Sequence, residues 1–275
     1  MASTSAFDTF EQCRMIDNST NFMGESALRS FAYDDTLCTL AGKKNQSALR
    51  FWVHNQTIVL GTQDTRLTYI QDAIAFLQKQ HIDVVVRNSG GLAVYLDEGV
   101  LNISLIFPGD STFSINEGYE RMVSLIRHMF SHTQIDTGEI KGSYCPGSYD
   151  LSIDGKKFAG ISQRRIRNGI AVQIYLCVSG SGSARAITVK EMYATAVQDS
   201  EPKFDYPRIE PAVMASLNEL LNESYTVSQV IELAKKSATS LKLDLYEEPL
   251  SDSFKLLYEA QLERVIDRHN RCLRP

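Results

Sequence analysis

The sequence lacks the features that mark several large classes of protein. It has 28 Lys and Arg against 33 Asp and Glu, a net charge of −5, and therefore no overall basic field that would hold nucleic acid or a membrane surface. No apolar stretch approaches the ~18 to 20 residues that a membrane-spanning helix needs. The sequence also has no internal repeat and no low-complexity tract. What is left is a globular chain of 275 residues in which any anion site must be local.

Cysteine and histidine are few and scattered. The 5 cysteines show no Cys-x-x-Cys spacing, and the N-terminus has no basic start followed by an apolar run. We therefore expect a reduced, cytoplasmic protein. None of the 5 histidines belongs to a zinc-type cluster, so the sequence predicts no metal site.

Short apolar and β-branched runs predict a β-rich centre. The expected strands cover residues 49–53, 57–60, 83–87, 92–96 and 101–107, with the first two forming a hairpin. Apolar positions at helical spacing predict helices over 69–80 and 115–130. Before residue 46, only a short helix within 22–31 and a turn over 42–45 are expected.

Two turn sequences organise the next segment. Asp154-Gly155 and Asn168-Gly169 are typical of type I′ turns, which join neighbouring antiparallel strands. They predict a meander of three strands, over 149–153, 156–165 and 170–178. With two-residue loops, Gly160 would lie between Tyr149 and Cys177.

The last third of the chain is predicted to be helical. Pro211 fits a first helical position, and Thr226 with Gln229 resembles a capping box. A final helix should span about 254–266. The whole pattern indicates an α+β fold with a mixed, largely antiparallel sheet, packed helices and further helices at the C-terminus.

Cys145 differs from the other cysteines in its surroundings. Residues 141–148 are so rich in glycine, serine and proline that only a loop can hold them. Cys177 lies in an apolar strand run and is expected to be a buried packing residue. A nucleophilic thiol needs a nearby cation or base, and no histidine is placed near this loop by the sequence. From the residues alone, Cys145 is either a nucleophile or an incidental loop thiol.

Two lysines follow the Asp154-Gly155 turn. Lys156 is best interpreted as a solvated charge at the end of a hairpin. Lys157 has the opposite strand parity and therefore points to the other face of the sheet. If it points into a cleft, its ammonium group could stabilise a thiolate and later an oxyanion.

A glycine turn follows the predicted strand 83–87. In Arg87-Asn88-Ser89-Gly90-Gly91, the glycines would let backbone N–H groups approach a ligand closely, as in anion nests. The alternative is a plain tight turn.

These motifs together resemble a known family. The run from Val85 to Asp97 resembles the lipoate-binding loop of the biotin and lipoate protein ligase superfamily, and Lys157 to Gly160 is similar to its lysine strand. Within that superfamily, residues 139–165 closely resemble the octanoyl-[glycine cleavage H protein]:protein N-octanoyltransferases. The resemblance covers nearly the whole chain. It implies one catalytic unit over 1–275, with a ligase-like core over about 44–248 and C-terminal helices from about 211.

The resemblance implies an activity and site residues. The activity is an amidotransfer of an octanoyl or lipoyl group from a lysine of glycine cleavage H protein to lysines on the lipoyl domains of 2-oxoacid dehydrogenases, without a cofactor. The cysteine matching Cys145 would form an acyl thioester, and the lysine matching Lys157 would lower the pKa of that thiol. The residues implied to bind the acyl group are Arg87, Ser89, Gly90, Gly91 and Gly160.

Two alternatives stay open. An ATP-dependent lipoate ligase would need magnesium and would release pyrophosphate. In the ligases, however, the loop has a third glycine and a histidine where this chain has Leu92 and Leu96, and a larger side chain at the first position would obstruct an adenylate phosphate. The second alternative is a carrier-binding module without activity, in which Cys145 is incidental.

Overall fold

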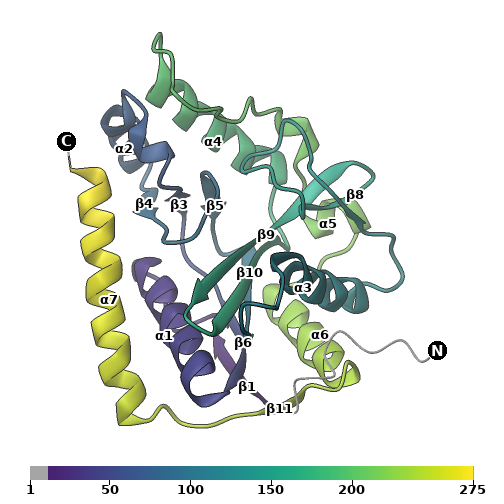
Figure 1. The fold of residues 1–275 in the computed structure, drawn as a ribbon. Coiled ribbons are helices and arrows are strands. Elements are labelled where there is room, and N and C mark those ends of the chain that lie inside the picture. Colours follow the sequence, from purple (N-terminus) through teal and green to yellow (C-terminus); the bar gives the residue numbers. More distant parts are fainter. Residues whose placement is uncertain (1–11, 275) are drawn as a thin grey trace.

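A computed structural model describes residues 12–274 and has the α+β fold that the sequence predicts (Figure 1). The larger sheet contains, in spatial order, β11 (Asp244–Tyr246), β1 (Gln12–Asn18), β2 (Ser47–Trp52), β6 (Val100–Pro108), β10 (Gly169–Cys177), β9 (Lys156–Ile166), β8 (Leu151–Ile153) and β7 (Asp136–Thr137). The smaller sheet contains β4 (Asp83–Val86), β3 (Thr57–Leu60) and β5 (Val94–Leu96). Only β1 with β2, β1 with β11, and β3 with β4 pair in parallel among the described strands, so the sheets are mixed and largely antiparallel.

Helices cover both faces of the larger sheet and one side of the smaller sheet (Figure 1). They are α1 (Leu28–Lys44), α2 (Ile70–Lys79), α3 (Ile115–Met129), α4 (Gly182–Val197), α5 (Leu217–Leu221), α6 (Val227–Ser240) and α7 (Asp252–Leu273). Helices α3 and α6 share an apolar core with one sheet face, α1 packs on the opposite face, and α2 packs against α4 beside the smaller sheet. Helix α7 lies along α1 and reaches β4. Within residues 12–274, no helix combines the length and apolarity of a membrane span.

Several elements that were predicted from the period of their apolar residues are confirmed. Helices α2, α3 and α7, the three strands of the smaller sheet and strands β2, β6, β8, β9 and β10 lie close to the expected ranges. The capping box at Thr226 is present, with its hydroxyl accepting from the Gln229 amide at 3.2 Å. The predicted hairpin over 49–60 is wrong, because β2 pairs with β1 and β6 while β3 pairs with β4 and β5. The expected turn over 42–45 is largely the end of α1.

The meander is confirmed, but its register differs from the prediction. The two-residue turn is Arg167-Asn168, and Gly169 is already a strand residue. A Cβ at Gly169 would lie 1.8 Å from the carbonyl oxygen of Cys38, so this glycine permits the close approach of α1 rather than the turn. As a result Gly160 lies opposite Tyr175 and not opposite Cys177.

This register places side chains in rows across the larger sheet. One row runs across β2, β6, β10 and β9 and consists of Trp52, Asn102, Tyr175 and Gly160. The next row on the same face consists of Arg50, Ser104, Gln173 and Ser162. Because residues two apart in a strand share a face, both rows face α1 and the smaller sheet.

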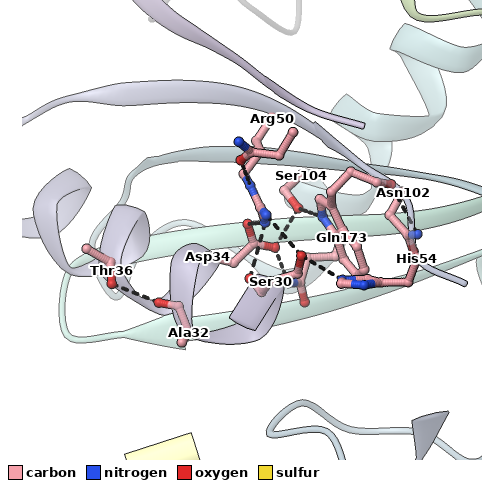
Figure 2. Close-up of polar contacts among 11 residues, drawn as sticks. Ser30, Ala32, Asp34, Thr36, Arg50, His54, Asn102, Ser104 and Gln173 are labelled. Atoms are coloured by element: carbon pink, nitrogen blue, oxygen red, sulfur yellow. Dashed lines mark hydrogen bonds and ion pairs between the residues drawn. The ribbon is translucent and has the colours of Figure 1, made fainter. Parts of the chain in front are cut away.

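A buried polar cluster joins the second row to α1 (Figure 2). Asp34 of α1 accepts hydrogen bonds from Arg50 at 2.8 Å, Ser104 at 2.6 Å and Gln173 at 2.6 Å. The Asp34 carboxylate is satisfied by three donors, as a buried charge requires. These bonds explain why α1 has no apolar stripe in its sequence, since several of its polar residues face the sheet.

His54 belongs to the same cluster and should make stability depend on pH. Burial, followed by the Arg50 charge, lowers the pKa of His54 to about 4, and its Nε2 lies 2.9 Å from the Ser30 hydroxyl. Between pH ~6.5 and ~4 the unfolded chain binds a proton that the folded chain excludes, so the free energy of unfolding falls as the pH falls. The loss is roughly 2 to 3 kcal/mol.

Urea unfolding at pH 7.5 and 4.5 tests this effect. The wild type should lose more stability than His54→Gln between the two pH values, and other titrating groups cancel in the difference. Equal losses in the two proteins would show that His54 is not excluded from protonation in the folded state.

Candidate active site

Six of the predicted site residues lie together around one cavity of about 260 Å³. The cavity is lined by residues of the glycine loop 87–92, of the cysteine loop 141–150 and of the first row of the larger sheet. The predicted residues that line it are Arg87, Ser89, Gly90, Gly91, Cys145 and Gly160, that is, the implied acyl-binding set together with the thiol. Its apolar wall includes Phe31, Val59, Val94 and Leu96.

Cys145 has an unusual backbone conformation. Its φ of 45° is in the left-handed region, which a non-glycine residue adopts at a cost of about 1 to 3 kcal/mol. The thiol is partly exposed, whereas Cys13, Cys38 and Cys177 are buried. Strain of this kind persists only when surrounding contacts hold the residue in place.

The Cys145 sulfur is held by two donors from the glycine loop. The Arg87 guanidinium and the Leu92 backbone amide each lie 3.2 Å from Sγ. Arg87 also donates to the Leu92 carbonyl, which fixes the guanidinium in this position. A cation and an amide dipole both favour the negatively charged form of a thiol, so the arrangement suits a nucleophilic thiolate.

Lys157 lies beneath the cysteine loop and is fully buried, while Lys156 is exposed as predicted. Its ammonium group donates to the carbonyl oxygens of Tyr144 at 3.0 Å and Cys145 at 2.8 Å. It also forms an ion pair with Asp150 at 2.9 Å. The contacts of this ammonium are therefore with loop oxygens, and its expected action on the thiol stays a prediction.

Asp150 is a site residue that the sequence analysis missed. Burial raises the pKa of its carboxyl group, and the Lys157 charge opposes that rise. The carboxylate accepts from the Gly147 amide at 3.1 Å and so ties the loop to Lys157. Asp150 lies directly before the first strand after the cysteine loop, and the turn at 154–155 brings Lys157 back beside it. This arrangement in the sequence could have identified the pair.

The glycine loop is itself anchored from both sides. Asn88 donates to Asp35 of α1 at 2.7 Å. The Ala93 amide donates to the Tyr193 hydroxyl at 3.2 Å, and that hydroxyl donates to Asp64 at 2.7 Å. Burial raises the pKa of Asp64 to about 6, against the effect of the Tyr193 hydrogen bond. These anchors come from distant segments and could not be read from local sequence.

No metal site accompanies this cavity. In the part of the chain from residue 12 to residue 274, no three His, Cys, Asp or Glu side chains gather in an arrangement that could hold a metal ion.

Substitution by alanine is expected to have different effects at the two glycines of the loop. A Cβ at Gly91, where φ is 100°, would lie 2.3 Å from Arg87 Nη2 and 3.0 Å from Cys145 Sγ. A Cβ at Gly90 would meet no atom within 4 Å. Gly91→Ala should therefore slow iodoacetamide alkylation of Cys145 at neutral pH by about tenfold or more, because it displaces the cation from the sulfur.

Gly90→Ala is the matched control and should react like the wild type. The unfolding midpoint of each variant separates a site effect from general destabilisation. Equal alkylation rates for Gly91→Ala and Gly90→Ala would indicate that the loop is a plain tight turn.

Comparison with known proteins defines the class to which this fold and site belong. The family model for the lipoyl protein ligase A/B catalytic domain matches residues 26–239. The chain belongs to this family.

The curated relatives carry a more specific name. The chain is 48% identical over 262 residues to octanoyl-[GcvH]:protein N-octanoyltransferase of Anoxybacillus flavithermus, across 94% of this chain and 95% of that protein. It is 46% identical over 264 residues to the Staphylococcus aureus protein of the same name, across 94% of each.

Solved structures agree on the fold. A lipoate-protein ligase A bound with ATP superposes with a TM-score of 0.72 and 18% identity, across 96% of this chain and 100% of that one. A putative lipoate protein ligase from T. acidophilum with bound lipoic acid gives a TM-score of 0.69 and 17% identity, across 92% and 95%. At these identities the likeness concerns the fold alone.

Proposed function

We propose that this protein is an amidotransferase that moves an octanoyl group from a lysine of glycine cleavage H protein to lysines on the lipoyl domains of 2-oxoacid dehydrogenases. The proposal rests on one observation above all, the Cys145 sulfur held between the Arg87 guanidinium and the Leu92 amide at a small cavity. The full-length relatives named as N-octanoyltransferases support the choice of acyl group and donor.

In the first half-reaction the Cys145 thiolate adds to the carbonyl carbon of the octanoyl-lysine amide. The π-electron pair moves to the carbonyl oxygen, and the resulting oxyanion collapses with cleavage of the C–N bond. The proton that the thiol gave up returns to the leaving lysine nitrogen. The products are an acyl thioester on Cys145 and a free lysine amine on the donor, so atoms and charge balance.

The second half-reaction reverses the roles of the two carriers. The ε-amine of the acceptor lysine attacks the thioester carbonyl and forms the C–N bond, and the C–S bond breaks. The proton that the new amide nitrogen loses balances the restored thiolate, so the free thiol is regenerated overall. Amide bonds are present before and after the transfer, so the exchange is nearly balanced in free energy and needs no nucleotide. Lys157 and Asp150 act as positioning residues, because they hold the carbonyl of Cys145 and the loop in the strained conformation.

The lining of the cavity supports the transfer of an acyl group. Its Val59, Val94 and Leu96 walls suit a short aliphatic chain. Activation of the acyl group by a nucleotide is also unnecessary, because the cysteine itself carries the acyl group as a reactive thioester.

We further propose that residues 1–275 act as one catalytic unit and work in the cytoplasm. The five cysteines are free, as a reducing compartment would keep them. Helix α7 supports the single unit, because its His269 accepts from the Val86 amide at 3.2 Å, next to Arg87.

A transfer assay tests the proposed function. The purified protein is mixed with octanoylated glycine cleavage H protein and an apo lipoyl domain, without nucleotide and with EDTA. Octanoylation of the lipoyl domain is expected. Transfer only after addition of ATP and magnesium would indicate a ligase, and binding of the carriers without transfer would indicate an inactive module.

A further inference from the structure

Tyr175 lines the cavity, and its hydroxyl is buried. Tyr175 is on β10, directly opposite Gly160 of β9, and both residues line the cavity together with Cys145. A Cβ at Gly160 would lie 2.6 Å from Tyr175 Cε1 and 3.1 Å from its hydroxyl oxygen. The tyrosine ring therefore lies over the glycine, and the hydroxyl points along the sheet toward β9.

This hydroxyl is buried without a hydrogen-bond partner among the described residues. Only 8% of the residue is exposed. A buried hydroxyl usually has a partner, because leaving it unpaired costs about 1 to 3 kcal/mol. An unpaired polar group in the wall of a cavity is satisfied when a ligand supplies the missing partner.

A second unpaired group in the same wall narrows the chemistry of that ligand. Arg87 Nε is also buried without a partner in the described chain, and an arginine nitrogen can only donate. Burial raises the pKa of Tyr175 well above its usual value, so the hydroxyl keeps its proton. Two residues that line the cavity next to Cys145 therefore have unpaired donors, and the missing partner is an acceptor.

We propose that the Tyr175 hydroxyl donates a hydrogen bond to the acyl carbonyl oxygen and holds the oxyanion that forms when Cys145 attacks. The inference rests on the proposed acyl transfer and adds a catalytic residue to it. No proton is transferred in this step. The thiolate forms the S–C bond, the π pair moves to the carbonyl oxygen, and the Tyr175 O–H bond stays intact.

Neighbouring rings keep the hydroxyl in place. Tyr144 stacks on Tyr175 with ring centroids 5.9 Å apart, and the Lys157 ammonium lies 5.8 Å from the Tyr175 ring centroid. A donor that is fixed before the reaction stabilises the developing charge without reorganisation. The tyrosine was not identified from the sequence, because it lies in an apolar strand run and the predicted register placed Gly160 opposite Cys177.

Single-turnover acylation of Tyr175→Phe by octanoylated glycine cleavage H protein tests the proposal. The rate constant at saturating donor should fall by about a hundredfold, as for the loss of one oxyanion donor. Iodoacetamide should alkylate Cys145 at the wild-type rate, because the sulfur keeps its two donors. The unfolding midpoint should not decrease, since the hydroxyl removed has no partner in the described chain.

Tyr258→Phe is the matched control. Its ring packs beside Tyr33 and Phe254 outside the cavity, so its loss of a hydroxyl should leave acylation unchanged. A rate within twofold of wild type in Tyr175→Phe would overturn the inference while leaving the proposed function in place. A wild-type protein that forms no thioester would instead refute the proposed function.

Discussion

Cys145→Ser should reduce octanoyl transfer by at least about a thousandfold and should leave no acyl adduct on the protein. Serine is close in size to cysteine, and its oxygen can accept from Arg87 and Leu92 in the same way. The fold should therefore persist, with an unfolding midpoint near that of the wild type. The loss is chemical, because a serine hydroxyl is not ionised near neutral pH and none of the described residues that line the cavity is a histidine that could act as a base.

Cys272→Ser is the control for this variant. Cys272 is also a partly exposed thiol, but it lies in α7 and does not line the cavity. Its replacement should change neither transfer nor the adduct. Normal turnover in Cys145→Ser would show that the reaction does not pass through this thiol.

Lys157→Met should produce the second large effect, a loss of both stability and transfer. The substitution removes the cation that balances the buried Asp150 carboxylate and the hydrogen bonds that hold the Tyr144 and Cys145 carbonyls. Removing one partner of a buried pair costs about 3 to 5 kcal/mol. We expect urea unfolding to show a loss of that size and transfer to fall at least about a hundredfold, because the strained loop is no longer held.

A double substitution separates the two effects. Lys157→Met with Asp150→Leu removes both charges, and an apolar pair in place of a buried ion pair restores much of the stability. Transfer should stay low in the double variant, since the cysteine loop still lacks its anchor. Lys156→Met, on the exposed neighbour, should change neither property. Recovery of transfer together with stability would mean that Lys157 matters to the fold alone.

The sequence predicted elements whose side chains alternate with a clear period. Helices α2 and α3 each have one apolar face, and the meander has explicit turn residues, so local rules were sufficient. Helix α1 was predicted only as a short segment, because Asp34 and Asp35 face the protein interior and their partners come from other elements. Strands β1 and β11 were missed because β11 is a three-residue edge strand and the pairing of both strands is set by long-range contacts.

The site was predicted only in part, because local patterns identify its loops but not the long-range contacts between them. The glycine and cysteine loops are local sequence features, and the structure places their residues around one cavity. Arg87 was expected among the acyl-binding residues, but its guanidinium lies at the sulfur. That contact joins residues 58 positions apart. The pairing of Tyr175 with Gly160 also joins separate strands, and its register depends on the exact turn. Cross-strand register and loop contacts carry the chemistry, and neither follows from local patterns.

The most direct measurement is the intact mass of the wild-type protein after mixing with octanoylated glycine cleavage H protein alone, without ATP. The mass should rise by one octanoyl group, peptide mapping should place the group on Cys145, and hydroxylamine should remove it, as it cleaves a thioester. Addition of an apo lipoyl domain should then discharge the adduct to the acceptor lysine. A protein that transfers the octanoyl group but carries no adduct on Cys145 at any time would contradict the account.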